Sequence, residues 1–123
     1  AAQSFSYLQG VPATASLVFD VRFLPNPYFE EGLRALSGDA PEIAAWLEGY
    51  EEVGEAVERI VDLIQYLIPR YGRELKTHLT IAVGCTGGRH RSVYLAEKIG
   101  HELSGLGHEV VVDHRDRDRW RFR

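Results

Sequence analysis

The chain has 123 residues, a formal net charge of −4, 45% apolar residues and 26% charged residues. This length fits one domain with a core of its own, and the negative total excludes a strongly basic nucleic-acid-binding module. One cysteine excludes an intrachain disulfide and a zinc cluster built from cysteines, and no apolar run approaches the ~20 residues that span a bilayer. We therefore expect a cytoplasmic protein with no cofactor, metal or membrane partner, and the lack of methionine even at position 1 predicts a fragment or processed chain.

Segments with strand-like and helix-like patterns alternate along the chain. The clearest helix covers 51–68, where apolar residues recur at spacings of three and four and charged residues take the other face. The prolines of LPNPY, residues 24–28, prevent a helix until after Pro27, and we expect Asp39 to cap the next helix. In chain order the patterns predict a strand at 4–7, a buried strand at 16–23, a short helix at 28–36, a helix from about Pro41, the helix at 51–68, a strand at 78–84, a helix at 91–104 and a strand at 108–114.

This order of elements predicts an α/β fold with a small, mostly parallel sheet flanked by helices. The chain contains no internal repeat and no low-complexity linker, so residues 1–123 are expected to form a single domain. In parallel sheets, ligands bind at the carboxyl ends of the strands. The loops that follow the predicted strands are therefore the first places to look for a functional site.

The stretch GCTGGRHRS, residues 84–92, joins the predicted strand 78–84 to the predicted helix 91–104. Glycines allow backbone N–H groups to turn inward, and the start of a helix favours an anion. Arginine guanidinium groups bind phosphate oxygens in pairs, and hydroxyl groups add further donors. The stretch is neither a Walker A motif nor G-x-G-x-x-G. It predicts a phosphate or anion site made by Cys85, Thr86, Gly87, Gly88, Arg89, His90, Arg91 and Ser92.

The same stretch has the C-x5-R spacing of cysteine phosphatases, with Cys85 as nucleophile and Arg91 as phosphate clamp. A helix N-terminus lowers the pKa of a thiol, and Asp20 would then serve as general acid. The stretch departs from that pattern because Gly84 stands where phosphatases usually have histidine, and no tryptophan-proline-aspartate loop is present. A cysteine at a strand end is also often only a small packed side chain. The residues alone leave a binding module and an enzyme both open.

A second group of polar residues lies in FDVRFLPNP, residues 19–27, at the carboxyl end of another predicted strand. Asp20 and Arg22 are explained structurally by an ion pair at the sheet end. The functional interpretation is that Asp20, Arg22 and Asn26 face the same cleft as the glycine loop and bind an amine or sugar hydroxyl. The two groups together predict a small phosphorylated ligand that carries hydroxyl groups.

Three segments together resemble a known family, and the likeness runs from about Phe5 to Arg115. The family is that of the RapZ C-terminal domain, also called the YvcJ family, of bacterial RNase adaptor and P-loop proteins. The full-length proteins of this family also have an N-terminal Walker-type domain, so nucleotide hydrolysis is not carried over to this chain. The segments are LVFDVRFLPNP (17–27), IAVGCTGGRHRSVYLAE (81–97) and the closing HRD (114–116).

The resemblance implies a regulatory module that binds glucosamine-6-phosphate and self-associates. In some enterobacterial members the domain also binds small RNAs and presents one to an endoribonuclease, so that amino-sugar synthesis is regulated. The resemblance places Cys85 to Arg91 on the phosphate side of the pocket, and it places Asp20, Arg22 and Asn26 on the sugar side. A domain that serves only for oligomerisation is a third hypothesis, which large exposed apolar helix faces would favour.

The last eleven residues, 113–123, carry five arginines and three aspartates, a local charge of 5 − 3 = +2 against −6 for the remainder. Clustered positive charge with aromatic side chains is what binding to the RNA backbone requires. The structural explanation is a solvated tail of alternating charge, and this ending departs from the lysine-rich ending that we associate with RNA-binding members. The candidate RNA contacts are Arg115, Arg117, Arg119 and Arg121, with Trp120 and Phe122 available for stacking.

Overall fold

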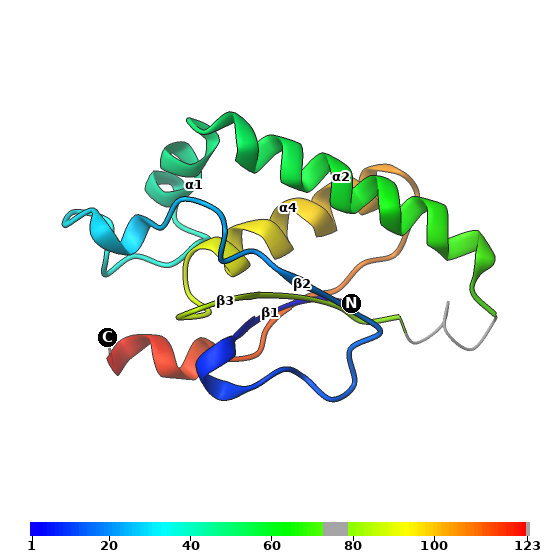
Figure 1. Ribbon diagram of the computed structural model, residues 1–123, viewed down its shortest axis with the longest axis horizontal. Helices are drawn as coiled ribbons and strands as arrows, with labels where there is room; N and C mark the ends of the chain where they lie inside the picture. Colours follow the sequence, from blue (N-terminus) through cyan, green and yellow to red (C-terminus); the bar gives the residue numbers. More distant parts are fainter. Residues whose placement is uncertain (73–78, 123) are drawn as a thin grey trace.

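The computed structural model describes the backbone of residues 1–72 and 79–122, and side chains up to residue 119 (Figure 1). Strands and helices alternate through this part of the chain, and short 3-10 turns connect several of them. The elements are β1 (Ala2–Ser6), β2 (Leu17–Asp20), α1 (Pro41–Glu48), α2 (Glu51–Leu67), β3 (Ile81–Cys85), α4 (Arg91–Gly105) and β4 (Val112–His114).

The described strands form one parallel sheet in the order β2-β3-β1-β4. The register pairs Ser6 with Cys85 and Asp20 with Gly84, so β1, β2 and β3 end at nearly the same level. Strand β4 pairs with the other side of β1 and sets His114 opposite Ser4. The predicted α/β fold with a parallel sheet is confirmed.

Helices α1, α2 and α4 lie together on one side of the sheet (Figure 1). Helix α4 packs directly on β1 and β3, α2 packs on α4, and α1 contacts both helices. The start of α4 therefore lies beside the carboxyl ends of the central strands. The predicted helix 91–104 is confirmed, since α4 extends only one residue further.

Helix α2 confirms the prediction for 51–68, with its last residue one position earlier. The 3-10 turn Ile68–Arg70 follows it, because Pro69 cannot continue the α-helical hydrogen bonds. The outer face of α2 carries acidic residues, and its opposite, apolar face packs into the core. The core residues that α2 contributes are Val53, Ala56, Val57, Ile60, Val61 and Ile64.

Three predictions for the region before α2 are wrong. The strand predicted as buried over 16–23 is the short edge strand β2, in which exposure alternates and Val18 is 42% exposed. The helix predicted at 28–36 is a single 3-10 turn followed by other turns. Asp39 does not cap α1, because Ala40 takes the N-cap position and Asp39 contacts Ser37 and Arg117 instead.

The remaining strands are displaced or shorter than predicted. Strand β3 runs from Ile81 to Cys85 in place of 78–84, and residue 78 lies outside the described residues. The strand predicted at 4–7 runs from Ala2 to Ser6, and only Val112–His114 of the predicted 108–114 is strand. Within the described part of the chain, no helix is long and apolar enough to cross a membrane.

Candidate functional site

A pocket of about 330 Å³ opens where β3 ends and α4 begins. Its volume lies in the usual range for small-molecule sites, roughly 300–1,000 Å³. The predicted glycine loop supplies one wall, and the segment after β2 supplies the wall opposite. The lining residues are Leu8, Asn26, Tyr28, Phe29, Cys85, Thr86, Gly87, Arg89, His90 and Arg91.

Backbone N–H groups of the glycine loop are available to a ligand. Among the described residues, the N–H groups of Thr86 and Gly87 donate to no protein acceptor. Gly88 has φ +64° and lies against Ser6, where a Cβ would come within 2.7 Å of the Ser6 backbone nitrogen. Only glycine fits this position, so Gly88 lets the loop turn close to Ser6 while the Thr86 and Gly87 N–H groups stay without a protein acceptor.

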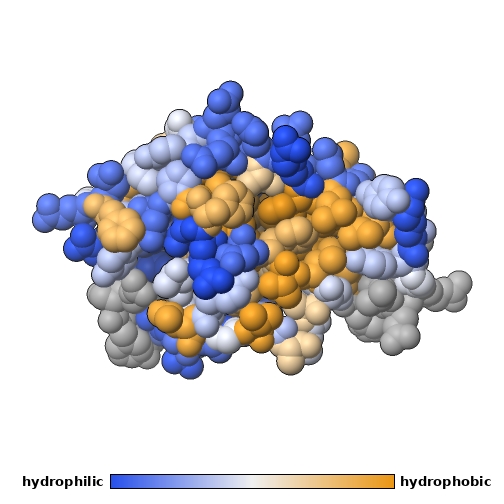
Figure 2. Space-filling view, viewed as in Figure 1, coloured by the Kyte–Doolittle hydropathy of each residue, from blue (hydrophilic) through white to orange (hydrophobic). Residues whose placement is uncertain are grey.

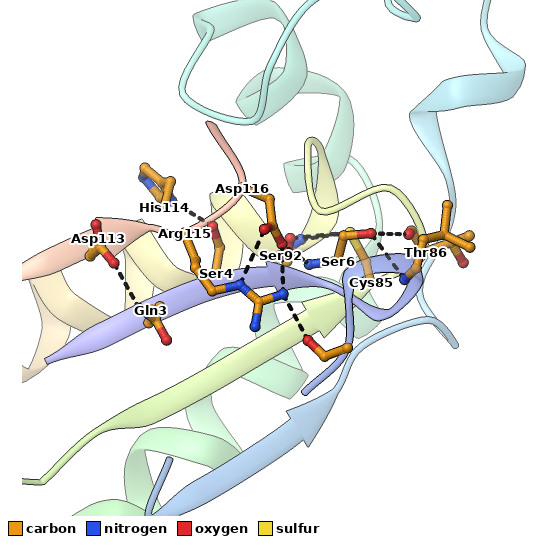
Figure 3. Close-up of polar contacts among 12 residues, drawn as sticks. Gln3, Ser4, Ser6, Cys85, Thr86, Ser92, Asp113, His114, Arg115 and Asp116 are labelled. Atoms are coloured by element: carbon orange, nitrogen blue, oxygen red, sulfur yellow. Dashed lines mark hydrogen bonds and ion pairs between the residues drawn. The ribbon is translucent and has the colours of Figure 1, made fainter. Parts of the chain in front are cut away.

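Cys85 ends β3 with its sulfur at the N-terminus of α4. The Ser92 backbone N–H donates to Cys85 Sγ at 3.4 Å, and Sγ lies 3.1 Å from Ser92 Oγ (Figure 3). The Cys85 residue is only 2% exposed, although it forms part of the pocket wall. Ser92 does not line the pocket, and its side chain contacts the Cys85 sulfur instead.

Residues 22–38, here called the strap, cross over the glycine loop and are held there by its basic side chains. Arg91 is 4% exposed, and its Nη1 donates to the carbonyls of Arg22 (2.7 Å) and Leu24 (3.0 Å). Arg89 donates from Nε to the Leu36 carbonyl at 3.3 Å and from Nη2 to the carbonyl of Ala35. The basic residues predicted for the ligand therefore also fix the strap.

Two further contacts bring the end of the strap close to the loop. His90 Nε2 lies 3.2 Å from the Arg34 carbonyl, and the Gly38 N–H donates to the Arg89 carbonyl at 2.7 Å. A Cβ at Gly38 would lie 2.3 Å from the His90 carbonyl oxygen, so this approach requires glycine. The strap and the loop thus form one continuous pocket wall.

Arg91 keeps donors for an anion after it has bound the strap. A guanidinium carries five N–H groups, and the two carbonyls use only Nη1. In the described part of the chain, Nε and Nη2 of Arg91 have no protein acceptor. None of the pocket-lining residues is a carboxylate, so the pocket is cationic.

The strap contributes Asn26 and two aromatic rings to the pocket. Asn26 Oδ1 accepts the Tyr28 N–H at 3.1 Å and so caps the turn Pro27–Phe29, while its amide nitrogen has no acceptor among the described residues. Phe29 is 76% exposed, and its ring meets that of Tyr28 edge to face at 5.7 Å. Sequence reasoning missed Tyr28, Phe29 and Leu8, although apolar residues directly after a turn at a strand end were the available signal.

Asp20 and Arg22 lie outside the pocket lining. They form an exposed ion pair at 2.7 Å, and the Arg22 guanidinium stacks 3.9 Å from the centre of the Tyr7 ring. Hydrogen bonds from Arg22 lower the pKa of the Asp20 carboxyl below its usual value. In this structure both residues therefore form an ion pair at the end of the sheet, as their structural interpretation predicts, and neither lines the pocket.

The arginine-rich end is partly committed to internal contacts. Arg115 pairs with Asp116 at 3.0 Å and also donates to the Gly10 carbonyl, and Arg117 reaches Asp39 at 3.4 Å. Arg119 is exposed. The predicted contacts Arg121, Trp120 and Phe122 have side chains outside the described part. Among the described residues, no cluster of His, Cys, Asp and Glu could hold a metal ion.

The fold and pocket define a small parallel α/β domain with a cationic pocket, which lies where a strand, a glycine loop and a helix meet. The family model described as the RapZ C-terminal domain matches residues 1–118. The chain belongs to this family.

Relatives that are named as nucleotide-binding proteins occur in several bacteria. The chain is 46% identical to the one from Finegoldia magna, over 95% of this chain and 41% of the relative. It is 48% identical to one from Clostridium novyi, over 92% and 38%, and 49% identical to one from Vibrio cholerae, over 91% and 39%. The chain thus spans about two fifths of the length of these curated relatives.

Proposed function

We propose that this domain is a ligand-sensing regulatory module that binds an amino-sugar phosphate, glucosamine-6-phosphate, at residues 84–92. One observation carries the proposal: the uncommitted N–H groups of Thr86 and Gly87 and the remaining donors of Arg91 belong to residues of one pocket. Backbone N–H groups and a buried arginine are the donors that phosphate oxygens prefer. The lack of a carboxylate in the lining favours an anion further.

The strap would hold the sugar ring. Asn26 offers an amide nitrogen, and the rings of Tyr28 and Phe29 offer apolar faces against which a sugar ring can pack. Of the three residues assigned to the sugar side from the sequence, Asn26 alone lines this pocket, while Asp20 and Arg22 pair with each other outside it. We therefore assign the ring side to Asn26, Tyr28 and Phe29.

A cysteine-dependent phosphatase fits the geometry less well. Such an enzyme needs an accessible thiolate and a protonated acid near the leaving group. Cys85 is almost fully buried and contacts Ser92, and no carboxylate lines the pocket. The proposed acid, Asp20, lies outside the pocket, and its pKa is lowered, which keeps it ionised.

Calorimetric titration with glucosamine-6-phosphate tests the proposal, with glucosamine and inorganic phosphate as controls and phosphate release followed in the same samples. We expect saturable binding without release in the wild type and in Cys85→Ser, because Cys85 serves as pocket wall. Arg91→Ala should weaken binding at least about tenfold, since a charge-assisted donor is lost.

Three outcomes would contradict this proposal. Release that disappears in Cys85→Ser would establish a phosphatase. Unchanged affinity in folded Arg91→Ala would show that the loop is not the phosphate site. An absence of binding in the wild type would exclude the amino-sugar phosphate as ligand.

The family resemblance leads us to propose also that the arginine-rich end contacts a small RNA that is presented to an endoribonuclease. The exposed positions of Arg117 and Arg119 support a phosphate-backbone contact. The ion pair of Arg115 with Asp116 reduces the charge that this end can offer. The RNA contact proposed here is therefore electrostatic and weak at high salt.

Binding of a short single-stranded RNA, measured at several salt concentrations, tests this contact. Arg119→Ala should weaken affinity about threefold and lower the slope of log affinity against log salt by about one. Arg59→Ala is the control, because Arg59 lies on the outer face of α2 and is also exposed to solvent. Equal effects of the two substitutions would contradict a specific role for the arginine-rich end.

We further propose that the domain self-associates through the edge of its sheet. Figure 2 shows apolar side chains gathered over the part of the surface where α2 and β2 lie. Leu63 of α2 and Val18 of β2 are exposed, and Leu17 and Phe19 of β2 are half-buried. An exposed edge strand can pair with the same strand of a second copy. Contact between two such edges would cover this apolar strip.

Sedimentation over a range of protein concentrations tests the self-association. Val18→Lys should raise the dissociation constant of the dimer about tenfold, because it places a charge on the pairing edge. Val11→Lys is the matched control, since Val11 is also an exposed valine but lies in the loop after β1. A monomeric wild type, or equal effects of both substitutions, would exclude this interface.

A further inference from the structure

The peptide bond between Thr86 and Gly87 fixes which loop amide faces the pocket. No described peptide bond is cis, so the Thr86 carbonyl and the Gly87 N–H point in opposite directions. The Thr86 carbonyl accepts the hydroxyl of Ser6 at 2.7 Å (Figure 3). Since the carbonyl is held against β1, the Gly87 N–H is turned away from β1, and Gly87 lines the pocket.

The hydroxyl of Ser6 has one hydrogen, and its other contact determines where that hydrogen goes. Ser6 Oγ accepts the Leu8 N–H at 3.1 Å, so its own hydrogen is available to donate to Thr86. Gly88 packs against the Cβ and backbone of the same serine. Ser6 thus contacts the glycine loop at Thr86 and at Gly88 while remaining outside the pocket lining.

Asp116, from the closing HRD motif, holds the backbone of Ser6. Its Oδ2 accepts the Ser6 N–H at 2.7 Å, and both of its oxygens receive donors from Arg115, at 3.1 and 3.0 Å. The carboxylate is buried, and its pairing with Arg115 offsets the cost of removing it from water. The HRD motif therefore reaches the glycine loop through Ser6, as the chain of dashed lines in Figure 3 shows.

We propose that Ser6 is a positioning residue for the phosphate site, and that Asp116 fixes Ser6 for this purpose. The role rests on the proposed function, because what it sets is the direction of the Gly87 amide that receives the anion. Neither side chain touches the ligand. Their loss should therefore lower the affinity for the phosphate group itself, whatever ring that phosphate carries.

Strand β1 offers a matched control in Ser4. Ser4 and Ser6 are both buried serines on the helix-covered side of β1, two residues apart. The Ser4 hydroxyl pairs with Nδ1 of His114 at 2.7 Å on the neighbouring strand β4. Ser4→Ala thus removes a buried hydroxyl from the same strand without removing a donor to the glycine loop.

The experiment is a titration with inorganic phosphate, followed by the amide NMR signals of residues 86–91, in the wild type, Ser6→Ala and Ser4→Ala. We expect the Gly87 signal to respond in the wild type, and the affinity of Ser6→Ala to fall about tenfold, since one oriented donor is lost. Ser4→Ala should stay within about twofold of the wild type. Thermal unfolding of each variant would establish that it is folded at the temperature of the titration.

The outcomes separate this proposal from the proposed function. A wild-type loop that does not respond to phosphate would overturn both. A wild-type response with equal affinity in Ser6→Ala would overturn the positioning role alone, as would equal losses in Ser6→Ala and Ser4→Ala. If Ser6→Ala does not fold, Asp116→Asn tests the same chain of contacts, with an expected loss of about threefold. Unchanged affinity in that variant would likewise overturn the positioning role.

Discussion

The parallel pairing of β1 with β3 is the constraint on which the rest of the site depends. It sets Ser6 opposite Cys85, so that the last residue of β1 lies where the glycine loop leaves the sheet. Because β4 pairs with the other side of β1, the closing HRD motif arrives at the same place from the far edge. Two segments that are distant in sequence thus meet at one end of a single strand.

The glycine loop is held between β1 and the strap. Toward β1, its carbonyl at Thr86 is bound and Gly88 is packed against Ser6. Toward the strap, Arg89 and Arg91 donate to main-chain carbonyls. Binding a charged guanidinium to neutral carbonyls removes it from water without cancelling its charge. The arginines are therefore both structural and still attractive to an anion.

The sequence predicted the parts of the structure that follow from local pattern. The spacing of apolar residues predicted α2, and the strand, glycine loop and helix around Cys85 were predicted because their residue types are specific. It did not predict that β2 is a short edge strand, because the apolar run of 16–23 looks the same in a buried and an edge strand. The difference arises from strand order, which no local pattern contains.

The residues that line the pocket were predicted only in part, because some of them are brought there by contacts that no local pattern contains. Residues 85–87 and 89–91 line it with Asn26, but Asp20 and Arg22 do not, because an aspartate two residues before an arginine at a strand end can bind that arginine directly. Tyr28 and Phe29 line it because the strap folds back over the loop, a long-range contact. The link from Asp116 through Ser6 to Thr86 likewise depends on three segments that only the folded sheet brings together.

A crystal structure of this domain with glucosamine-6-phosphate tests the central claim most directly. We expect the phosphate oxygens within hydrogen-bonding distance of the Gly87 N–H and of Nε or Nη2 of Arg91, with the sugar ring between Asn26 and Phe29. A phosphate bound elsewhere, at the arginine-rich end or in the apolar pocket near Ile68 and Val110, would contradict the account.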